Sequence, residues 1–137
     1  ELRNKFKTLL GNLHVGSANA FVDSVVIAAY TQCDQWLDEL NEYIKGNLEY
    51  FAKEINSIAP LKMHVPEGTY LAWVDCRGLK MTDEELTAFF KEKCHLAFNG
   101  GTFFGPEGSG FVRANMACPR SYVEEAVKRI KAGVASL

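Results

Sequence analysis

The sequence predicts an α+β fold, in which a small, mostly antiparallel sheet is covered by helices and entered through a long amphipathic helix. Three observations predict it. Apolar residues recur at spacings of three and four from about Asp34 to Ser57. After Pro60 the hydrophobic period shortens to that of strands. Two Ser/Thr-x-x-Glu capping boxes then mark helix starts between and after the strands.

The long helix gives the strongest periodic signal. Gly46-Asn47 in its middle costs about 1 kcal/mol in helix propensity and is a candidate bend, although the apolar stripe continues in phase across it. Pro60 ends the helical stretch because it cannot continue a helix. The stripe consists of Leu37, Leu40, Ile44, Leu48, Phe51, Ile55 and Ile58.

A shorter helix is predicted ahead of the long one, from Phe21 to about Gln32, with Ser17 or Asn19 as its N-cap. Its middle segment, 24–30, reads SVVIAAY and is apolar nearly all round. A helix of this composition is normally covered on more than one side. We therefore expect it to be buried against another part of a protein.

Four strands are predicted after Pro60. Leu61–Val65 and Thr69–Val74 flank the turn Pro66-Glu67-Gly68 and read as a hairpin. His95–Phe98 and Gly110–Met116 are the third and fourth strands.

Two helices accompany these strands. Thr82 and Glu85 form a capping box that opens a helix through Leu86, Phe89 and Phe90. Ser121 and Glu124 form a second box, which opens the last helix. The first-turn acids, Asp83-Glu84-Glu85 and Glu124-Glu125, are explained by their favourable interaction with the helix dipole. The apolar stripe of the last helix is Val123, Val127, Ile130 and Val134.

Composition excludes several classes of protein. The chain has 137 residues, 47% hydrophobic and 23% charged, with a net charge of -2. This near balance gives no field for holding a nucleic acid, and no apolar run is long enough to cross a membrane. We expect a cytoplasmic protein. Because the chain begins at Glu1, in what reads as the middle of a protein, we also expect it to be a piece of a longer one.

The cysteines and histidines do not form a recognisable site. Cys33, Cys76, Cys94 and Cys118 are widely spaced, without a Cys-x-x-Cys pair, so zinc and thioredoxin-like sites are excluded by spacing. Cys94 is followed by His95, but neighbours in a strand point to opposite faces, so a reduced, partly buried thiol is the favoured interpretation. His14 and His64 have no patterned partners and are interpreted as structural.

A glycine-rich segment runs from Asn99 to Gly110, with Gly100 and Gly101 at its start. No G-K-[ST] follows it and no helix begins at its end, so it makes a weak phosphate site. From the residues alone we favour a mobile connection between two strands. The adjacent Phe103 and Phe104 nevertheless indicate that the segment folds over something, either its own protein or a ligand.

Arg113 lies in the middle of the fourth predicted strand, with no acidic residue in that strand to pair with it. Alternation places Phe111, Arg113 and Asn115 on one face of the strand. Arginine holds a carboxylate well, by two parallel hydrogen bonds, and stays charged at any working pH. From spacing alone, we favour the ordinary alternative of an arginine paired with a distant acid or exposed at an edge. No Ser/His/Asp set, inward carboxylate pair or activated lysine is indicated.

Three ordered blocks carry a resemblance to a known family. They are 68–77 (GTYLAWVDCR), 99–105 (NGG followed by FG) and 110–120 (GFVRANMACPR). Together they resemble the C-terminal third of a class I/II aminotransferase-like, fold type I pyridoxal-phosphate enzyme, closest to the MalY/PatB-type cystathionine beta-lyases. The resemblance covers the whole chain, beginning at Leu13-His14.

The resemblance implies roles for particular residues. Arg113 matches the arginine that grips the α-carboxylate of the substrate amino acid, which reverses the preference from spacing. Asn99, Gly100 and Gly101 would lie at the active-site mouth and move with the small domain. Residues 1–33 would be the end of the large cofactor-binding domain, and residues 34–137 the small C-terminal domain.

The sequence departs from the family at the cofactor. The family's cofactor lysine stands in an S-K-x-F-N-type block, and no lysine of this chain does. The resemblance therefore implies pyridoxal phosphate in a longer parent, with none bound to this chain, no catalytic residue here and no activity alone. The implied reaction of the parent is cleavage of cystathionine to homocysteine, pyruvate and ammonia. The implied partners are an amino-acid substrate, the missing large domain and a second copy, since the helix at 21–32 would otherwise expose an apolar surface.

Two alternatives stay open. An aminotransferase would use the same carboxylate-binding arginine, and the groups that decide between the two reactions are absent from this chain. A stand-alone module that captures a small carboxylate with Arg113 and the glycine-rich segment belongs to a different class of function.

Overall fold

A computed structural model describes residues 1–15 and 19–137, which divide into two units, residues 1–39 and 40–137. The first unit contains helix α1 (Leu2–Leu13), helix α2 (Val22–Gln32) and the first residues of helix α3 (Asp34–Asn56). Helix α1 was not predicted. It ends where His14 takes a left-handed conformation, with φ of 53°.

Helix α2 agrees with the predicted helix, but its N-cap does not. Phe21 occupies the cap position and gives no side-chain capping bond. Asn19 instead accepts a hydrogen bond from the Phe21 backbone N–H at 2.9 Å, within the turn before the helix. The other predicted cap, Ser17, lies outside the described residues. The cap was missed because this turn, rather than a side chain reaching into the helix, sets where α2 begins.

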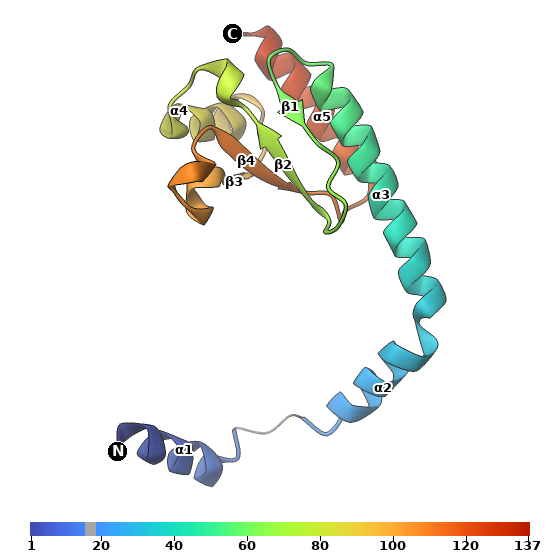
Figure 1. The fold of residues 1–137 in the computed structure, drawn as a ribbon, viewed down its shortest axis with the longest axis vertical. Coiled ribbons are helices and arrows are strands. Elements are labelled where there is room, and N and C mark those ends of the chain that lie inside the picture. Colours follow the sequence, from blue (N-terminus) through green and yellow to red (C-terminus); the bar gives the residue numbers. More distant parts are fainter. Residues whose placement is uncertain (16–18) are drawn as a thin grey trace. The chain divides into compact units, whose positions relative to one another are not determined.

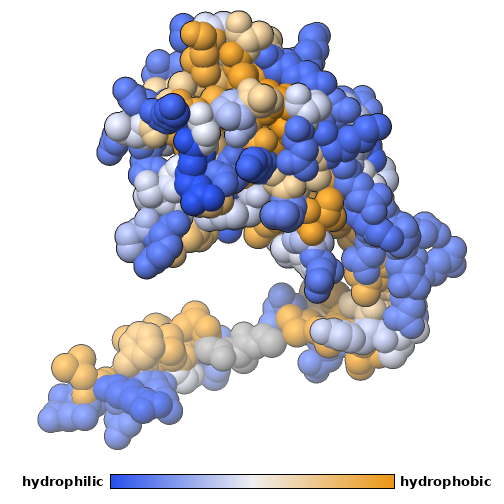
Figure 2. All heavy atoms as spheres, turned by 45° about the horizontal axis from the view of Figure 1, so that its top comes forward, coloured by the Kyte–Doolittle hydropathy of each residue, from blue (hydrophilic) through white to orange (hydrophobic). Residues whose placement is uncertain are grey.

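The helices α1 and α2 carry no buried residue in this structure. Large apolar side chains are exposed along both, as the hydrophobic colouring of their surfaces shows (Figure 2). Examples are Phe6, Leu9, Val25, Ile27 and Tyr30.

The second unit is built on a four-stranded antiparallel sheet in the order β1-β2-β4-β3 (Figure 1). The strands are β1 (Lys62–Met63), β2 (Leu71–Asp75), β3 (Asn99–Gly100) and β4 (Phe111–Asn115). The hairpin of β1 and β2 was predicted, and it places Met63 opposite Val74. Strand β4 lies beside β2, with Ala114 opposite Ala72 and Val112 opposite Val74. The predicted α+β fold with a small antiparallel sheet is therefore confirmed.

One face of the sheet packs against the helices. Alternate residues of β2 and β4 are buried, so this inner face is apolar, as period-2 patterning requires. Helix α3, helix α4 (Asp83–Ala88) and helix α5 (Arg120–Ala135) contribute to the same core. The core residues of the sheet are Met63, Ala72, Val74, Val112, Ala114 and Met116, and those of the helices include Leu48, Phe51, Ile55, Leu86, Val123, Val127 and Ile130.

Helix α3 continues through Gly46-Asn47 as one helix, and this pair has a packing role. A Cβ at Gly46 would lie 3.3 Å from Nη2 of Arg120, so glycine leaves room for that side chain. The fully buried Asn47 donates hydrogen bonds from Nδ2 to the carbonyls of Met116 and Cys118, both at 2.9 Å. The poor helix propensity of the pair is thus offset by contacts that tie α3 to the end of β4.

The third strand was predicted in the wrong place. Residues 95–98 are not extended in the sheet, and β3 consists of Asn99 and Gly100 only. The cause is local: five residues, Phe89–Lys93, form a π turn after α4, and His95 then takes a left-handed conformation with φ of 55°. Leu96 donates its backbone N–H back to the carbonyl of Phe90, which keeps this part of the chain out of the sheet.

Only the first of the two predicted capping boxes forms. Thr82 and Glu85 bond reciprocally, as predicted. The last helix starts one residue before Ser121, with Pro119 as its N-cap and no side-chain capping bond. The backbone N–H of Arg120 donates instead to the hydroxyl of Tyr43 on α3 at 2.7 Å, so a tertiary contact replaces the local cap.

Candidate functional site

Three side chains form a row across the sheet on the face opposite the core. Strand register places Trp73 of β2 opposite Arg113 of β4, and Asn99 of β3 opposite Arg113 on its other side. Residues paired in this way point to the same face of a sheet. The predicted side of β4 is therefore confirmed for Arg113. We call these three residues the Arg113 row.

Arg113 has a neutral partner rather than an acid. Its Nη2 donates a hydrogen bond to Oδ1 of Asn99 at 3.1 Å. None of the ion pairs formed within residues 1–15 and 19–137 involves Arg113. A guanidinium has five N–H donors in one plane. The charge and most of the donors of Arg113 thus remain available to an anion, and the pairing with a distant acid that we favoured from spacing is not found in the described chain.

An aromatic ring supports the guanidinium from one side. Cζ of Arg113 lies 4.4 Å from the ring centroid of Phe104, a cation–π distance. The ring of Phe104 meets Trp73 edge to face, with centroids 5.7 Å apart. The ring of Phe103 also meets that of Phe104 edge to face, with centroids 5.0 Å apart, but the Phe103 side chain is 79% exposed. The two phenylalanines therefore differ: Phe104 covers the Arg113 row and Phe103 faces outward.

The glycine-rich segment is folded into two short 3₁₀ turns, Gly101–Phe104 and Pro106–Gly108. Their backbones touch, because a Cβ on Gly101 would lie 2.0 Å from the carbonyl oxygen of Gly108. The far end is fixed by Asp83, whose carboxylate accepts hydrogen bonds from the Ser109 hydroxyl and the Gly110 N–H, both at 2.8 Å. These bonds lower the pKa of Asp83. The segment is thus tied down at both ends, which the preference for a mobile connection did not anticipate.

A second arginine lies near the same sheet face. Arg77, just after β2, donates from Nε and Nη2 to the two carboxylate oxygens of Asp75, at 3.0 and 2.8 Å. Its Cζ lies 4.8 Å from the ring centroid of Phe111, which stacks on Trp73. The charge of Arg77 is therefore compensated, and the pKa of Asp75 is lowered, chiefly by this hydrogen-bonded pair.

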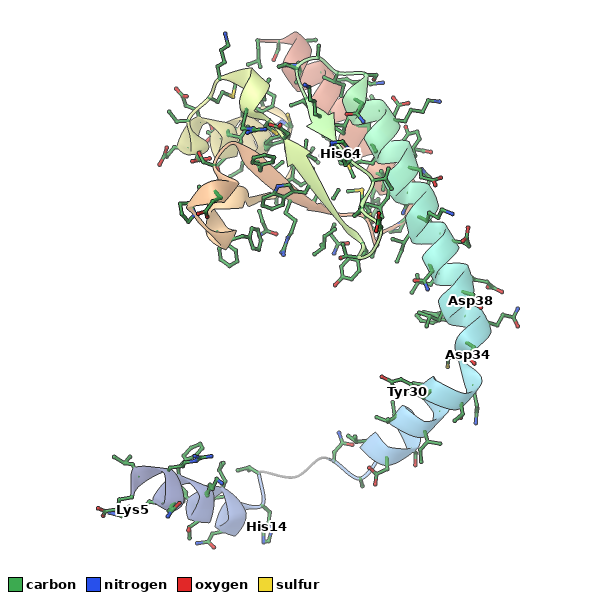
Figure 3. All side chains as sticks on the ribbon, in the orientation of Figure 1. Lys5, His14, Tyr30, Asp34, Asp38 and His64 are labelled. Carbon is green, nitrogen blue, oxygen red and sulfur yellow. The ribbon has the colours of Figure 1, made fainter. Side chains whose placement is uncertain are left out.

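None of the residues that form the Arg113 row is a cysteine or a histidine. Cys76 and Cys94 are buried, and burial raises the pKa of Cys76 to about 12, so its thiol is protonated and unreactive at neutral pH. His14 follows α1 and His64 follows β1, in different units (Figure 3). The described residues contain no group of three or more side chains that could hold a metal ion.

Four cavities among the described residues are lined by none of the three residues of the Arg113 row. One of about 450 Å³ lies between α3 and the turn after β1, and Glu42, Lys45 and Glu67 are among its lining residues. None of its lining residues has a buried side-chain polar atom that lacks a hydrogen-bond partner. The chemically distinctive feature is therefore the Arg113 row, where a half-buried guanidinium has N–H donors of the kind that suit a carboxylate. The described residues that contact Arg113, Asn99 and Phe104, provide no acid–base or nucleophilic group.

Sequence reasoning singled out Arg113 and Asn99, but missed the roles of Trp73 and Asp83. Trp73 was named only as a member of a motif, and Asp83 was explained by the helix dipole alone. The adjacent Phe103 and Phe104 did indicate that the segment folds over something, and Phe104 contacts Trp73 and Arg113. Which residues it covers depends on strand register and on the path of the segment, and the sequence indicates neither.

No helix within the described ranges combines the length and apolar character needed to cross a bilayer.

Known proteins resemble this chain along most of its length. The family model described as aminotransferase class I and II matches residues 1–130. Protein MalY of Escherichia coli is 41% identical over 120 residues, which cover 87% of this chain and 31% of MalY. Cystathionine beta-lyase PatB of Bacillus subtilis is 34% identical over 133 residues, which cover 96% of this chain and 34% of PatB. The chain spans about a third of the length of these curated relatives.

A solved structure gives the same result. A PLP-bound protein of Clostridium difficile 630, described as an aminotransferase, superposes with a TM-score of 0.84 at 40% sequence identity, covering 93% of this chain and 33% of its own.

Proposed function

The chain belongs to the aminotransferase class I and II family, and on that premise we propose that it is the C-terminal part of a pyridoxal-phosphate-dependent carbon–sulfur beta-lyase, in which Arg113 binds the α-carboxylate of the substrate. The observation that carries the proposal is the charge of Arg113, which forms no ion pair within the described residues and is contacted by the neutral Asn99 and the ring of Phe104. Cystathionine is the proposed substrate, because one relative is named a cystathionine beta-lyase. The proposed products are homocysteine, pyruvate and ammonia.

The residues present fit the substrate and not the cofactor. Pyridoxal phosphate needs a lysine for its aldehyde and donors for its phosphate. The side chains that contact Arg113 are an amide and an aromatic ring, and neither provides an amine. No lysine of the chain stands in an S-K-x-F-N-type block. In this proposal the chain binds and orients the substrate, and the chemical steps belong to the rest of the parent.

We propose that residues 1–33 belong to the large domain of the parent and residues 34–137 to the small one. The division of the structure into units 1–39 and 40–137 supports a boundary near the start of α3. The exposed apolar side chains of α1 and α2 support the idea that the large domain covers them. The isolated chain should then self-associate, which light scattering measures. A monodisperse monomer with these helices exposed would contradict the proposal.

The first experiment concerns the longer protein that we propose. Incubated with pyridoxal phosphate and cystathionine, it should release pyruvate, and Arg113→Ala should raise KM strongly. Intact activity of Arg113→Ala would refute the assignment of Arg113. The 137-residue chain alone should show neither pyruvate release nor a visible absorbance band that borohydride removes.

An aminotransferase is the second candidate, favoured by the structural neighbour that is described as one. Both reactions would use Arg113 in the same way. Formation of a 2-oxo acid that keeps the sulfur substituent, with transfer of the amino group to an acceptor, would identify it. Pyruvate with a free thiol identifies the lyase. If calorimetry instead finds that the isolated chain binds amino acids, and that Arg113→Ala abolishes this binding, a stand-alone carboxylate-binding module is favoured.

A further inference from the structure

We propose that Asn99 and Phe104 are positioning residues, which together hold the Arg113 guanidinium in the one orientation that leaves its donors open to a carboxylate. This inference rests on the proposed function of Arg113.

Asn99 fixes the direction of the guanidinium without neutralising it. It is the register partner of Arg113 across β3 and β4, so the backbone places the two side chains next to each other. Its Oδ1 accepts from one terminal nitrogen of Arg113 at 3.1 Å. An aspartate here would make the same contact, but its charge would pair with Arg113 and compete with a bound carboxylate. A neutral amide acceptor is what a vacant anion site requires.

Phe104 fixes the plane of the guanidinium. Its ring centroid lies 4.4 Å from Cζ of Arg113, so one flat face of the cation is covered. The N–H donors of arginine lie in the plane of the group, and a carboxylate approaches them in that plane. Covering the face therefore leaves the donors free. It also disfavours rotation of the side chain, because rotation would give up the cation–π contact.

The segment that carries Phe104 is itself held in place. Asn99 and Gly100 pair with β4 at its beginning, and Asp83 accepts two hydrogen bonds at its end. Between these points Phe104 contacts Trp73 edge to face. The two positioning residues thus reach Arg113 from one segment, and Phe103 in the same segment provides an internal control because its side chain is turned to solvent.

The test uses the longer protein proposed above, loaded with pyridoxal phosphate, and compares KM and kcat for cystathionine. Arg113→Ala is the reference and should raise KM by about 100-fold, as expected for losing charge-assisted hydrogen bonds. Asn99→Ala and Phe104→Leu should each raise KM by about 3- to 10-fold and change kcat by less than about 3-fold, since they act through Arg113. Phe103→Leu should leave both constants unchanged.

Two further measurements separate positioning from a general loss of structure. Asn99→Asp is nearly isosteric and should raise KM more than Asn99→Ala at neutral pH, because its carboxylate would pair with Arg113 and compete with the substrate. Adding Asn99→Ala to Arg113→Ala should cause no further rise in KM, because a positioning residue has nothing left to position.

The outcomes distinguish this inference from the proposed function. If Arg113→Ala leaves KM unchanged, the proposed function fails, and the inference with it. If Arg113→Ala raises KM while Asn99→Asp and Phe104→Leu stay within about twofold of the parent, the inference alone is overturned. Equal effects of Phe103→Leu and Phe104→Leu, or additive effects of Asn99→Ala and Arg113→Ala, would also overturn it.

Discussion

Two arginines near the same sheet face have similar aromatic support and opposite electrostatic situations. Cζ of Arg77 lies 4.8 Å from the ring centroid of Phe111, and Cζ of Arg113 lies 4.4 Å from that of Phe104. Trp73 contacts both phenylalanine rings, because it stacks on Phe111 and meets Phe104 edge to face. Arg77 is bound by both oxygens of a carboxylate, whereas Arg113 is bound by a single amide oxygen.

The difference teaches how a fold keeps a cation available. Asp75, the bidentate partner of Arg77, engages two of its five N–H donors and compensates its charge, so an incoming anion gains much less there. Arg113 has the same kind of scaffold without the acid. The residue that distinguishes a structural arginine from a binding one is therefore its neighbour, not the arginine itself.

The largest effect is expected on kcat/KM when Arg113, rather than Arg77, is replaced in the longer, cofactor-loaded protein. Arg113→Ala should lower kcat/KM by about 10²- to 10³-fold, because two charge-assisted hydrogen bonds to the substrate carboxylate contribute about 3–4 kcal/mol. Arg77→Ala should change kcat/KM by less than about 3-fold, since the charge of Arg77 is already compensated by Asp75. Steady-state kinetics measures both, and equal losses would break the comparison.

The next effect concerns the backbone contact behind Phe104. Gly101→Ala forces a Cβ to within 2.0 Å of the Gly108 carbonyl, so the segment must move. We expect a loss of about 1–3 kcal/mol in the free energy of unfolding, as for overpacked sites, and a higher KM. Gly68→Ala is the matched control because no atom lies within 4 Å of its Cβ position. Urea denaturation measures the free energy of unfolding of the two variants. Equal values would contradict the close contact between Gly101 and Gly108.

A smaller effect is expected at the anchor of the segment. The pKa of Asp83 is lowered, so its carboxylate stabilises the fold above its unfolded pKa near 4. This contribution is lost as pH falls through the lower folded pKa. Asp83→Asn should therefore be less stable than the parent at pH 7, and the difference should shrink in acid. Urea denaturation at pH 7 and pH 3 tests this, with Ser109→Ala, which removes one of the two bonds, expected to lie in between.

The smallest effect is expected from breaking the pair at Arg77. Asp75→Asn should cost at most about 0.5 kcal/mol in the free energy of unfolding, because the Arg77 side chain is 65% exposed and water screens the pair. The pKa of Asp75 is lowered, so this loss too appears at neutral pH and vanishes in acid. Thermal unfolding at pH 7 measures it. A large loss of stability would mean that the Arg77–Asp75 pair is important for the fold, and the contrast between Arg77 and Arg113 would then be larger.

Much of the fold was predictable because its signals are local. The stripe of α3, the hairpin of β1 and β2 and the capping box at Thr82 depend on residues close in sequence, and all three form. The predictions that were wrong have two different causes. The third strand was displaced by a π turn, which is local but is marked by no motif in the sequence. The second capping box was replaced by the bond from Arg120 to Tyr43, which joins residues far apart in the chain.

The predictions about the candidate site also differ in how far local sequence supports them. Alternation along β4 places Arg113 on one face with Phe111 and Asn115, and this follows from the sequence alone because the period of a strand is fixed. Its proposed role as a carboxylate ligand comes from the resemblance to a family, not from the pattern. Its immediate neighbours could not be predicted, since Asn99 and Trp73 are brought beside it by strand register and Phe104 by the turn at Gly101.

The sequence by itself determined the α+β class, the amphipathic α3 and the side of the sheet on which Arg113 lies, because these depend on periodicity and local hydrogen bonding. The tertiary structure decided which arginine keeps its charge available. That choice depends on the residues that folding brings within hydrogen-bond distance, Asp75 for Arg77 and Asn99 for Arg113. Only the three-dimensional path of the chain sets those distances, so no spacing in the sequence records them.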